Sequence, residues 1–228
     1  MIGFYHVYKQ YIKDSYAIYD INLSIERGEF YFLTGASGAG KTTLLKLIYK
    51  EELPTKGQIL IDSVNINLIP RKKLYRLRRK IGIVFQDFKL LNNRTVYENI
   101  AIPLVVRGYR KSYIDKMVKN SLSLVGLNHR KNYITSHISG GEQQRVAIAR
   151  AIAGNPKIII ADEPTGNLDT ELSIEILKIF EKINNNGVTV LIATHDNNLI
   201  KMFTKKTIEL KQGNLVSTPS MEERQWIY

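Results

Sequence analysis

The stretch from Gly35 to Thr43 has residue types and spacing that can bind a chain of phosphates. It reads Gly-Ala-Ser-Gly-Ala-Gly-Lys-Thr-Thr and fits the pattern G-x-x-x-x-G-K-[ST]. The apolar run Glu29 to Thr34 before it predicts a buried strand, and the run Leu44 to Ile48 after it predicts a helix. Glycines let backbone N–H groups turn toward an anion, and the helix N-terminus adds partial positive charge. The stretch therefore predicts a site for a nucleoside triphosphate, against the alternative of a chance glycine turn.

The same pattern assigns roles to individual residues of this loop. Lys41 is expected to reach the β- and γ-phosphates, and the hydroxyl group of Thr42 is expected to join the ligands of Mg²⁺. The loop as a whole should surround the phosphates. The predicted phosphate-binding residues are Gly35, Ala36, Ser37, Gly38, Ala39, Gly40, Lys41, Thr42 and Thr43.

Two carboxylates follow a second apolar run. Lys157 to Ala161 predicts a buried strand, and Asp162 and Glu163 stand at its carboxyl end. Ligands of open α/β sheets bind beyond the carboxyl ends of the strands, so both carboxylates should face the nucleotide. Asp162 suits Mg²⁺, and Glu163 can be the base or water-positioning group that hydrolysis needs. The alternative is a strand end with ordinary acidic residues.

A second candidate anion site begins at Ser139. The residues Ser139, Gly140, Gly141 and Glu142 open a helical stretch that runs to Ala153. Ser139 fits a helix N-cap position, and the two glycines allow a close approach of the backbone. By itself this would be an ordinary helix cap. The phosphate loop in the same chain favours an anion-binding role.

Together these motifs resemble the ATP-binding cassette (ABC) family over nearly the whole chain. Gly35 to Thr43 resembles the Walker A motif, Ile158 to Asp162 the Walker B motif, and Ile138 to Glu142 the signature pentad. The pentad departs from the commonest form, Leu-Ser-Gly-Gly-Gln, at its first and last residues. Three more motifs resemble the Q-loop, the D-loop and the switch histidine of the family: Gln86, Gly166 to Asp169, and His195.

The resemblance implies ATP and Mg²⁺ as ligands and gives each motif a role. Thr42, Gln86 and Asp162 would hold the metal ion. Glu163, His195 and Gln86 would act in hydrolysis, with Glu163 polarising the water and His195 contacting the γ-phosphate. Besides the phosphate loop, the residues implied to contact nucleotide are Tyr11, Ser139, Gly140, Gly141, Glu142 and Asp169.

Tyr11 lies where members of this family carry an aromatic residue that stacks on adenine. Stacking provides affinity with little discrimination between bases. Other tyrosines stand nearby in the sequence, so the assignment rests on the resemblance, and a structural tyrosine in a strand is the alternative. These neighbours are Tyr5, Tyr8, Tyr16 and Tyr19.

Strand and helix patterns alternate along the chain, with one interruption. Strand patterns occur at 2–7, 19–25, 29–34, 58–62, 81–85, 157–161, 188–193 and 206–210, and helical ones at 41–49 and 170–184. From Arg94 to Gly154 only helical patterns occur, at 95–104, 112–125 and 142–153. This order predicts a parallel-sheet α/β core with an inserted helical lobe.

With the resemblance added, the expected fold is a P-loop NTPase (RecA-like) core with an N-terminal antiparallel β subdomain and an inserted helical subdomain. Residues 1–228 would form one nucleotide-binding domain. Within it, 1–93 and 155–228 would form the ATP-binding core, and 94–154 the helical subdomain.

Composition limits the functional classes. The 228 residues include 33 basic and 21 acidic side chains, for a formal net charge of +12, and no cysteine. Disulfides and thiolate metal sites are therefore excluded, which suits a reducing cytosol. No run approaches the roughly 18 apolar residues of a membrane span. The basic run Arg71 to Lys80 predicts a helix with Leu74, Leu77 and Ile81 turned inward. Its charges form either a solvated face or a contact for anionic lipid or a membrane partner.

The resemblance also implies partners. Family members work as head-to-tail dimers, in which the phosphate loop of one subunit and the signature pentad of the other enclose each ATP. The Gln86–Leu91 segment would be the seat of a cytoplasmic helix of a separate integral membrane protein, with Phe88, Leu90 and Leu91 in contact; a buried hinge is the alternative. No nucleic-acid partner is expected. The implied location is the cytoplasmic face of the cell membrane, where that partner would recruit the chain as a peripheral subunit.

Among ABC proteins, the closest resemblance is to the bacterial cell-division ATP-binding proteins. It is carried by Phe32 to Ile48, Arg94 to Leu104 and Ala161 to Asp169. It implies ATP-driven control of peptidoglycan hydrolases through the membrane partner. The alternatives are the ATPase of a lipoprotein-releasing or drug-exporting transporter and a soluble cassette that acts on DNA or ribosomes. A GTPase is disfavoured because the chain lacks an Asn-Lys-x-Asp motif.

Overall fold

The computed structural model describes residues 1–12 and 15–217 of the chain. These residues form two compact units. The first unit contains Met1–Glu26, Phe30–Ile69 and the described residues from His195 onward. The second unit contains Arg27–Glu29 and Pro70–Thr194. No helix within these described ranges is long and apolar enough to cross a membrane.

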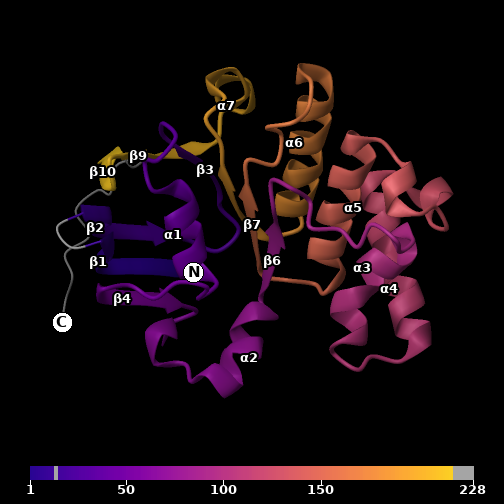
Figure 1. Ribbon diagram of the computed structural model, residues 1–228, viewed down its shortest axis with the longest axis horizontal. Helices are drawn as coiled ribbons and strands as arrows, with labels where there is room; N and C mark the ends of the chain where they lie inside the picture. The colour runs from indigo at the N-terminus through magenta and orange to yellow at the C-terminus, as the bar shows by residue number, and fades with distance from the viewer. Residues whose placement is uncertain (13–14, 218–228) are drawn as a thin grey trace. The chain divides into compact units, whose positions relative to one another are not determined.

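The first unit consists mainly of β-strands. Its elements are β1 (Ile2–Ile12), β2 (Ser15–Ile25), β3 (Phe30–Thr34), α1 (Lys41–Ile48), β4 (Lys56–Ile61), β5 (Val64–Asn65), α7 (Asn197–Phe203), β9 (Lys206–Lys211) and β10 (Asn214–Ser217). An antiparallel sheet has the order β2-β1-β4-β5, and Figure 1 shows β1, β2 and β4 side by side. Ile2 of β1 lies opposite Ile25 of β2 and Ile61 of β4, and all three side chains are buried. β9 pairs in parallel with β3 and antiparallel with β10.

The second unit places helices around three parallel strands. Its elements are α2 (Leu74–Arg78), β6 (Ile81–Val84), α3 (Val96–Val105), α4 (Lys111–Val125), α5 (Gly140–Ala153), β7 (Ile158–Asp162), α6 (Thr170–Asn185) and β8 (Thr189–Ala193). β7 is central: Ile158 lies opposite Ile81 of β6 and Thr189 of β8. Parallel strands end at the same edge of a sheet. Gln86, which follows β6, and Glu163, which follows β7, are therefore brought to one edge.

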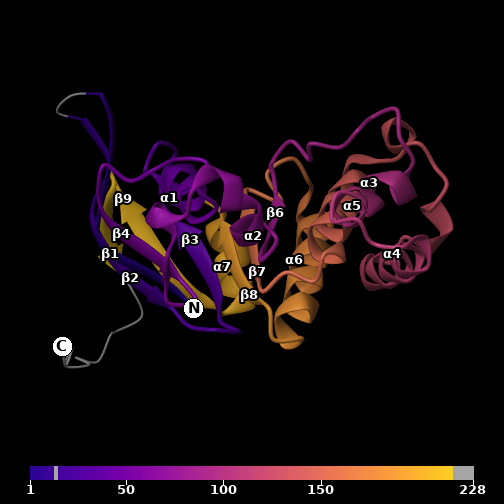
Figure 2. The ribbon, with the colours of Figure 1, turned by 90° about the horizontal axis from the view of Figure 1, so that it is seen from below.

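Helices α3, α4 and α5 occupy the interval between β6 and β7, where the inserted helical subdomain is predicted. They pack together in the view of Figure 2. α4 turns an apolar face inward, with Ile114, Val118 and Leu122 buried at a spacing of four residues. The predicted limits of this subdomain, 94–154, stay a prediction.

The predicted strands and helices are all present, with shifts at their ends, and α7, β5 and β10 have no predicted counterpart. For the basic run, the helical assignment that includes Ile81 is wrong, and the strand predicted to begin at Ile81 is confirmed. α2 contains only five residues, with Leu77 buried and Leu74 half-buried, and Ile81 begins β6. The reason is strand pairing: the carbonyl oxygen of Lys80 accepts hydrogen bonds from the N–H groups of Lys157 and Ile158, which starts the ladder to β7.

The basic side chains of α2 and the turn before it face outward. Arg71, Lys72, Lys73, Arg76 and Arg79 are all exposed. A solvated face and a contact for anionic lipid or a membrane partner both require charges that face outward. The structure is therefore compatible with both interpretations of this run.

Candidate active site

The phosphate loop connects β3 to α1, as the sequence predicts. Its backbone has left-handed φ angles of 139° at Gly35, 78° at Gly38 and 106° at Gly40. A Cβ atom on Gly35 would lie 2.2 Å from the carbonyl oxygen of Leu210, and one on Gly40 would lie 2.5 Å from that of Ala17. Only glycine fits at these two positions, so the path of the loop depends on them.

The start of α1 is open to an anion. Gly40 is its N-cap residue, and in the described part of the chain no side chain caps the helix and no acidic residue stands in its first turn. Its first N–H groups therefore keep their partial positive charge. Lys41 is only 7% exposed, and its Nζ donates to the carbonyl oxygens of Gly35 at 2.7 Å and Ala36 at 3.2 Å. The ammonium group is thus held over the loop, where a polyphosphate would need it.

Tyr11 stands near the end of β1 and is 54% exposed. The Nζ of Lys9 lies 4.7 Å from the centroid of its ring. Tyr8, Tyr16 and Tyr19 instead contact one another edge to face, with ring centroids 5.2 to 6.0 Å apart. Among the ring contacts within residues 1–12 and 15–217, Tyr11 is the one of these four tyrosines that does not pack against another ring. Its stacking on adenine stays a prediction.

Glu163 and Gln86 lie together at the strand edge of the second unit. A Cβ atom added to Gly166 would lie 3.7 Å from both the Nε2 of Gln86 and the Cβ of Glu163, so the two side chains flank Gly166. Glu163 has a left-handed φ of 46°, and its N–H donates to the carbonyl oxygen of Ala193 at 2.9 Å. Such a φ is unfavourable for a residue with a Cβ atom and is enriched at functional sites. Asp162, half-buried, precedes Glu163 directly.

The Ser139 pentad forms the start of α5 through a capping box, so the predicted N-cap position of Ser139 is confirmed. The Oγ of Ser139 accepts from the N–H of Glu142 at 3.3 Å, and the Glu142 carboxylate accepts from the N–H of Ser139 at 3.0 Å. The Nε of Arg130 donates to the same carboxylate at 2.7 Å. Burial raises the pKa of Glu142, but the Ser139 N–H and Arg130 outweigh it and lower the pKa below the ordinary value. Unlike α1, this helix start already contains a carboxylate.

The remaining predicted residues also stand at helix starts. Asp169 is the N-cap residue of α6, and its side chain accepts from the N–H of Leu172 at 2.9 Å. A Cβ atom on Gly141 would lie 3.2 Å from the Cδ1 of Leu172, so the starts of α5 and α6 are in contact. His195 is exposed and directly precedes Asp196, the N-cap residue of α7.

The structure thus groups the predicted site residues into two sets. The second unit contains Gln86, Ser139, Asp162, Glu163 and Asp169. The first unit contains the phosphate loop, Tyr11 and His195. Each set has its own chemistry: one holds the carboxylates and the signature helix, and the other holds the phosphate cradle. That both sets act on one nucleotide stays a prediction.

Two polar residues of α5 were missed by the sequence analysis. Gln144 is 0% exposed, and its Nε2 donates to the carbonyl oxygen of Pro164, directly after Glu163, at 2.7 Å. Its buried Oε1 has no hydrogen-bond partner among the described residues. Arg150 donates to backbone carbonyl oxygens just after Gln86. A signal for Gln144 was available: it stands four residues before the buried Ile148, on an apolar helix face.

The residues present fit a triphosphate with Mg²⁺. The uncapped start of α1, Lys41 above it and the exposed Thr42 in its first turn supply donors and a hydroxyl ligand. Over the described residues, no group of three His, Cys, Asp or Glu side chains could hold a metal ion. Mg²⁺ bound to a nucleotide keeps waters and phosphate oxygens as ligands and needs only one or two carboxylates. Thr42, Gln86 and Asp162 suit that limited role.

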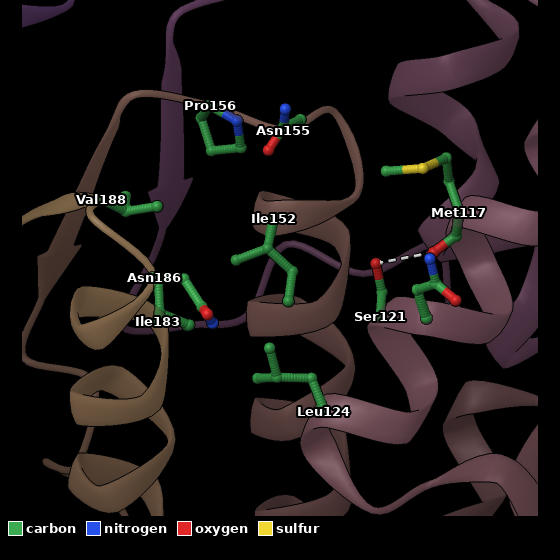
Figure 3. Close-up of a pocket in the computed structure, with 10 residues that line it drawn as sticks. Met117, Ser121, Leu124, Ile152, Asn155, Pro156, Ile183, Asn186 and Val188 are labelled. Carbon is green, nitrogen blue, oxygen red and sulfur yellow. Dashed lines mark hydrogen bonds between the residues drawn. The ribbon is translucent and has the colours of Figure 1, made fainter.

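A pocket elsewhere in the second unit has a different character. It has a volume of about 160 Å³ and lies among α4, α5 and the end of α6, as Figure 3 shows. Met117, Leu124 and Ile152 give it an apolar wall, and Asn155 and Asn186 contribute amides. Its described lining includes none of the residues predicted to bind nucleotide or metal.

Comparison with known proteins shows which family the chain belongs to. A sequence model of the family described as "ABC transporter" matches residues 18–166, a range that includes the phosphate loop, Gln86, the signature pentad and Glu163. The chain belongs to the ABC transporter family. This ABC protein is 48% identical to the cell division ATP-binding protein FtsE of Bacillus subtilis, over 98% of this chain and 98% of that relative. It is 45% identical to FtsE of Mycobacterium tuberculosis (95% and 94% covered) and 46% identical to FtsE of Escherichia coli (94% and 97% covered).

Solved ABC structures share its fold. One is the ATP-binding cassette MJ0796, a dimer in a post-hydrolysis state bound to ADP and Pi, with a TM-score of 0.86 and 38% identity over 95% of this chain and 97% of that one. Another is cbiO1 from Clostridium perfringens, part of an ABC transporter complex, with a TM-score of 0.88 and 33% identity over 95% and 86%. This likeness confirms the predicted fold class.

Replacing Glu142 with Gln in this ABC protein should lower the free energy of unfolding by about 1 kcal/mol at pH 7, because half of the capping box and the Arg130 pair are weakened. The folded-state pKa of Glu142 is lowered, so its stabilisation is present above the ordinary pKa of Glu and is lost as the pH falls through the folded-state value. The difference between wild type and E142Q, measured by urea denaturation at several pH values, should therefore shrink below about pH 4. A difference that stays constant with pH would contradict this.

Proposed function

We propose that this ABC protein binds MgATP at the Gly35–Thr43 loop and hydrolyses it with the Glu163 carboxylate. The observation that carries the proposal is the open start of α1 with the Lys41 ammonium held on the loop carbonyls. That arrangement concentrates positive charge at one helix start, as a polyanion requires. The family match and the ADP- and Pi-bound relative support ATP hydrolysis as the reaction.

The chain's own residues divide the chemical work. Glu163 accepts a proton from the attacking water or orients that water. Gln86, which lies beside Glu163, helps to position the water and the metal ligands. His195 contacts the γ-phosphate. Bound Mg²⁺ supplies neutralisation of the phosphate charge. Thr42, Gln86 and Asp162 hold the ion, and Tyr11 stacks on the adenine.

The active assembly is a head-to-tail homodimer that ATP closes. The phosphate loop and the signature pentad each offer a helix N-terminus, and each belongs to a different compact unit of the chain. In the dimer, the Lys41 loop of one subunit and the Ser139 pentad of the other enclose one ATP. A relative solved as a dimer supports this arrangement.

The output of the cycle is control of a membrane partner in cell division. Relatives from three organisms, each at least 45% identical, are named cell division ATP-binding protein FtsE, which favours this role over lipoprotein release or drug export. The partner is an integral membrane protein resembling FtsX, which controls peptidoglycan hydrolysis. It recruits the chain to the cytoplasmic face of the membrane and docks at Gln86–Leu91. The 50% exposure of Leu91 supports a docking seat rather than a buried hinge.

Replacing Lys41 with Ala should weaken MgATP binding roughly 10- to 100-fold, because the charged hydrogen bonds to the phosphates are lost. Titration calorimetry measures the Kd. Lys46→Ala is the matched control, since Lys46 is on the same helix and its ammonium pairs with Glu51, outside the phosphate loop. If K41A and K46A bind MgATP with equal Kd, Lys41 does not contact the phosphates.

Replacing Glu163 with Gln should lower kcat by roughly 100- to 10,000-fold while MgATP binding persists, because the base is lost and the phosphate loop is intact. The variant should then accumulate as an ATP-dependent dimer, visible by size-exclusion chromatography with light scattering. Glu171→Gln, an exposed neighbour on α6, is the control and should turn over like wild type. Unchanged turnover in E163Q would exclude Glu163 as the base.

Replacing Leu91 with Asp should reduce recovery of the chain in the membrane fraction when an FtsX-type partner is co-expressed, because a charge enters an apolar contact. Val64→Asp is the control, since Val64 is similarly exposed (49%) but stands outside the Gln86–Leu91 segment. Recovery is measured by quantitative immunoblotting after washing of the membranes. Equal recovery of both variants would place the docking surface elsewhere.

A further inference from the structure

Arg150, near the end of α5, is bonded to the segment that follows Gln86. Its Nη2 donates to the carbonyl oxygen of Phe88 at 2.6 Å, and its Nη1 donates to that of Lys89 at 2.5 Å. The guanidinium group is half-buried, and burial lowers its pKa, although an arginine stays charged at every physiological pH. The planar fork of one side chain thus holds two successive carbonyl groups.

The two residues that Arg150 holds have an unfavourable backbone. Phe88 has a φ of 57° and Lys89 a φ of 49°, both in the left-handed region. Side chains with a Cβ atom visit that region rarely, and two successive residues persist there only when surrounding contacts hold them. The charge-assisted bonds from Arg150 are such contacts. The conformation of this turn therefore depends on α5.

The far end of the segment is also attached to the helical elements. The Oδ1 of Asn99 on α3 accepts from the N–H of Leu91 at 2.8 Å, and the Nδ2 of Asn99 donates to the carbonyl oxygen of Leu91 at 3.1 Å. Thr135 donates its hydroxyl to the same carbonyl oxygen at 2.9 Å. The backbone from Phe88 to Leu91 is thus attached at both ends, while the Leu91 side chain stays exposed.

The same helix carries the signature pentad at its other end. Ser139 is the N-cap residue of α5, and Arg150 stands in its last turn. Gln144, between them, holds the carbonyl oxygen of Pro164 beside Glu163. A regular helix of 14 residues moves nearly as a rigid rod, so a displacement at Ser139 reaches Arg150 with little loss.

We propose that Arg150 is a positioning residue that makes the Phe88–Leu91 segment move with α5, so that the signature end of the helix and the segment shift as one body. The use of that coupling rests on the proposed function: closure of the dimer on ATP displaces Ser139, and the Arg150 bonds carry the displacement to the seat of the membrane partner. The positioning itself depends only on the contacts of Arg150 and is independent of ATP hydrolysis.

The first test measures mobility of the segment. The chain has no cysteine, so Lys89→Cys gives a unique thiol for a nitroxide spin label at an exposed side chain. Electron paramagnetic resonance of the full chain should show a label at least twofold more mobile in R150Q than in the parent. Arg145→Gln is the matched control, because Arg145 is on the same helix but bonds the carbonyl oxygen of Val125 and the carboxylate of Glu175. It should leave the label unchanged.

Arg150→Lys keeps the charge but offers a single nitrogen to two carbonyl groups, so the nitroxide label at position 89 should have intermediate mobility in this variant. If circular dichroism shows that R150Q does not fold, R150K replaces it in the mobility test. The proposal is overturned if the label is as immobile without Arg150 as with it, or if R145Q mobilises it equally.

The second test measures the coupling, in a Glu163→Gln background that binds ATP without turning it over. MgATP should change the label spectrum when Arg150 is present and should fail to do so in R150Q, while the Kd for MgATP changes less than twofold. A response that persists in R150Q, or one that is missing in the parent despite bound MgATP, overturns the coupling. If no variant binds MgATP, the proposed function is contradicted. The mobility measurement still decides whether Arg150 positions the segment.

Discussion

The first N–H groups of α1 have no side-chain cap among the described residues, and the Lys41 ammonium lies over the same loop. A triphosphate can be held only where positive charge is already oriented, since its own charges repel one another and any nearby carboxylate. The loop meets this need with backbone geometry. That geometry in turn requires glycine, because β9 and β2 bring the carbonyl oxygens of Leu210 and Ala17 against Gly35 and Gly40. The strands of the first unit therefore fix the backbone path of the phosphate loop.

The second helix start is built on the opposite principle. At α5 the Glu142 carboxylate bonds the N–H of Ser139 and pairs with Arg130, so part of the helix-end charge is already neutralised. Such a start binds a free polyanion weakly. In the proposed dimer this difference is useful, because the pentad meets an ATP whose charge the Lys41 loop and Mg²⁺ of the other subunit have largely offset. The pentad then adds geometry and specificity for the closed state more than raw electrostatic attraction.

The α5 helix connects three elements of the proposed site in the second unit. Ser139 stands at its start, Gln144 bonds the turn after Glu163, and Arg150 bonds the turn after Gln86. Glu163, just before the first turn, and Phe88 and Lys89, within the second, have left-handed φ angles, which depend on outside contacts to persist. The helix therefore does more than present the pentad. It also holds the two loops that carry Glu163, the proposed catalytic base, and the proposed partner seat.

The sequence by itself determined the features that consist of contiguous residues. The phosphate loop, the strand before Glu163 and the N-cap at Ser139 are local patterns in which neighbouring residues specify one another, so the ABC family and the fold class were predictable from them. The basic run shows the limit of local patterns. Two patterns compete at Ile81: its spacing from Leu77 is helical, whereas the apolar run that it begins predicts a strand, and pairing with β7 makes it the first residue of that strand.

Only the tertiary structure decided how distant residues serve the site. The bonds from Arg150 to Phe88 and Lys89 span 62 and 61 residues, and the pair of Arg130 with Glu142 depends on the fold of the loop before α5. No local pattern encodes such partners. Every residue has a backbone carbonyl group, so the residue type at the acceptor position does not reveal which side chain bonds it. Motif residues can be read along the chain, whereas the residues that hold them in place are defined by packing.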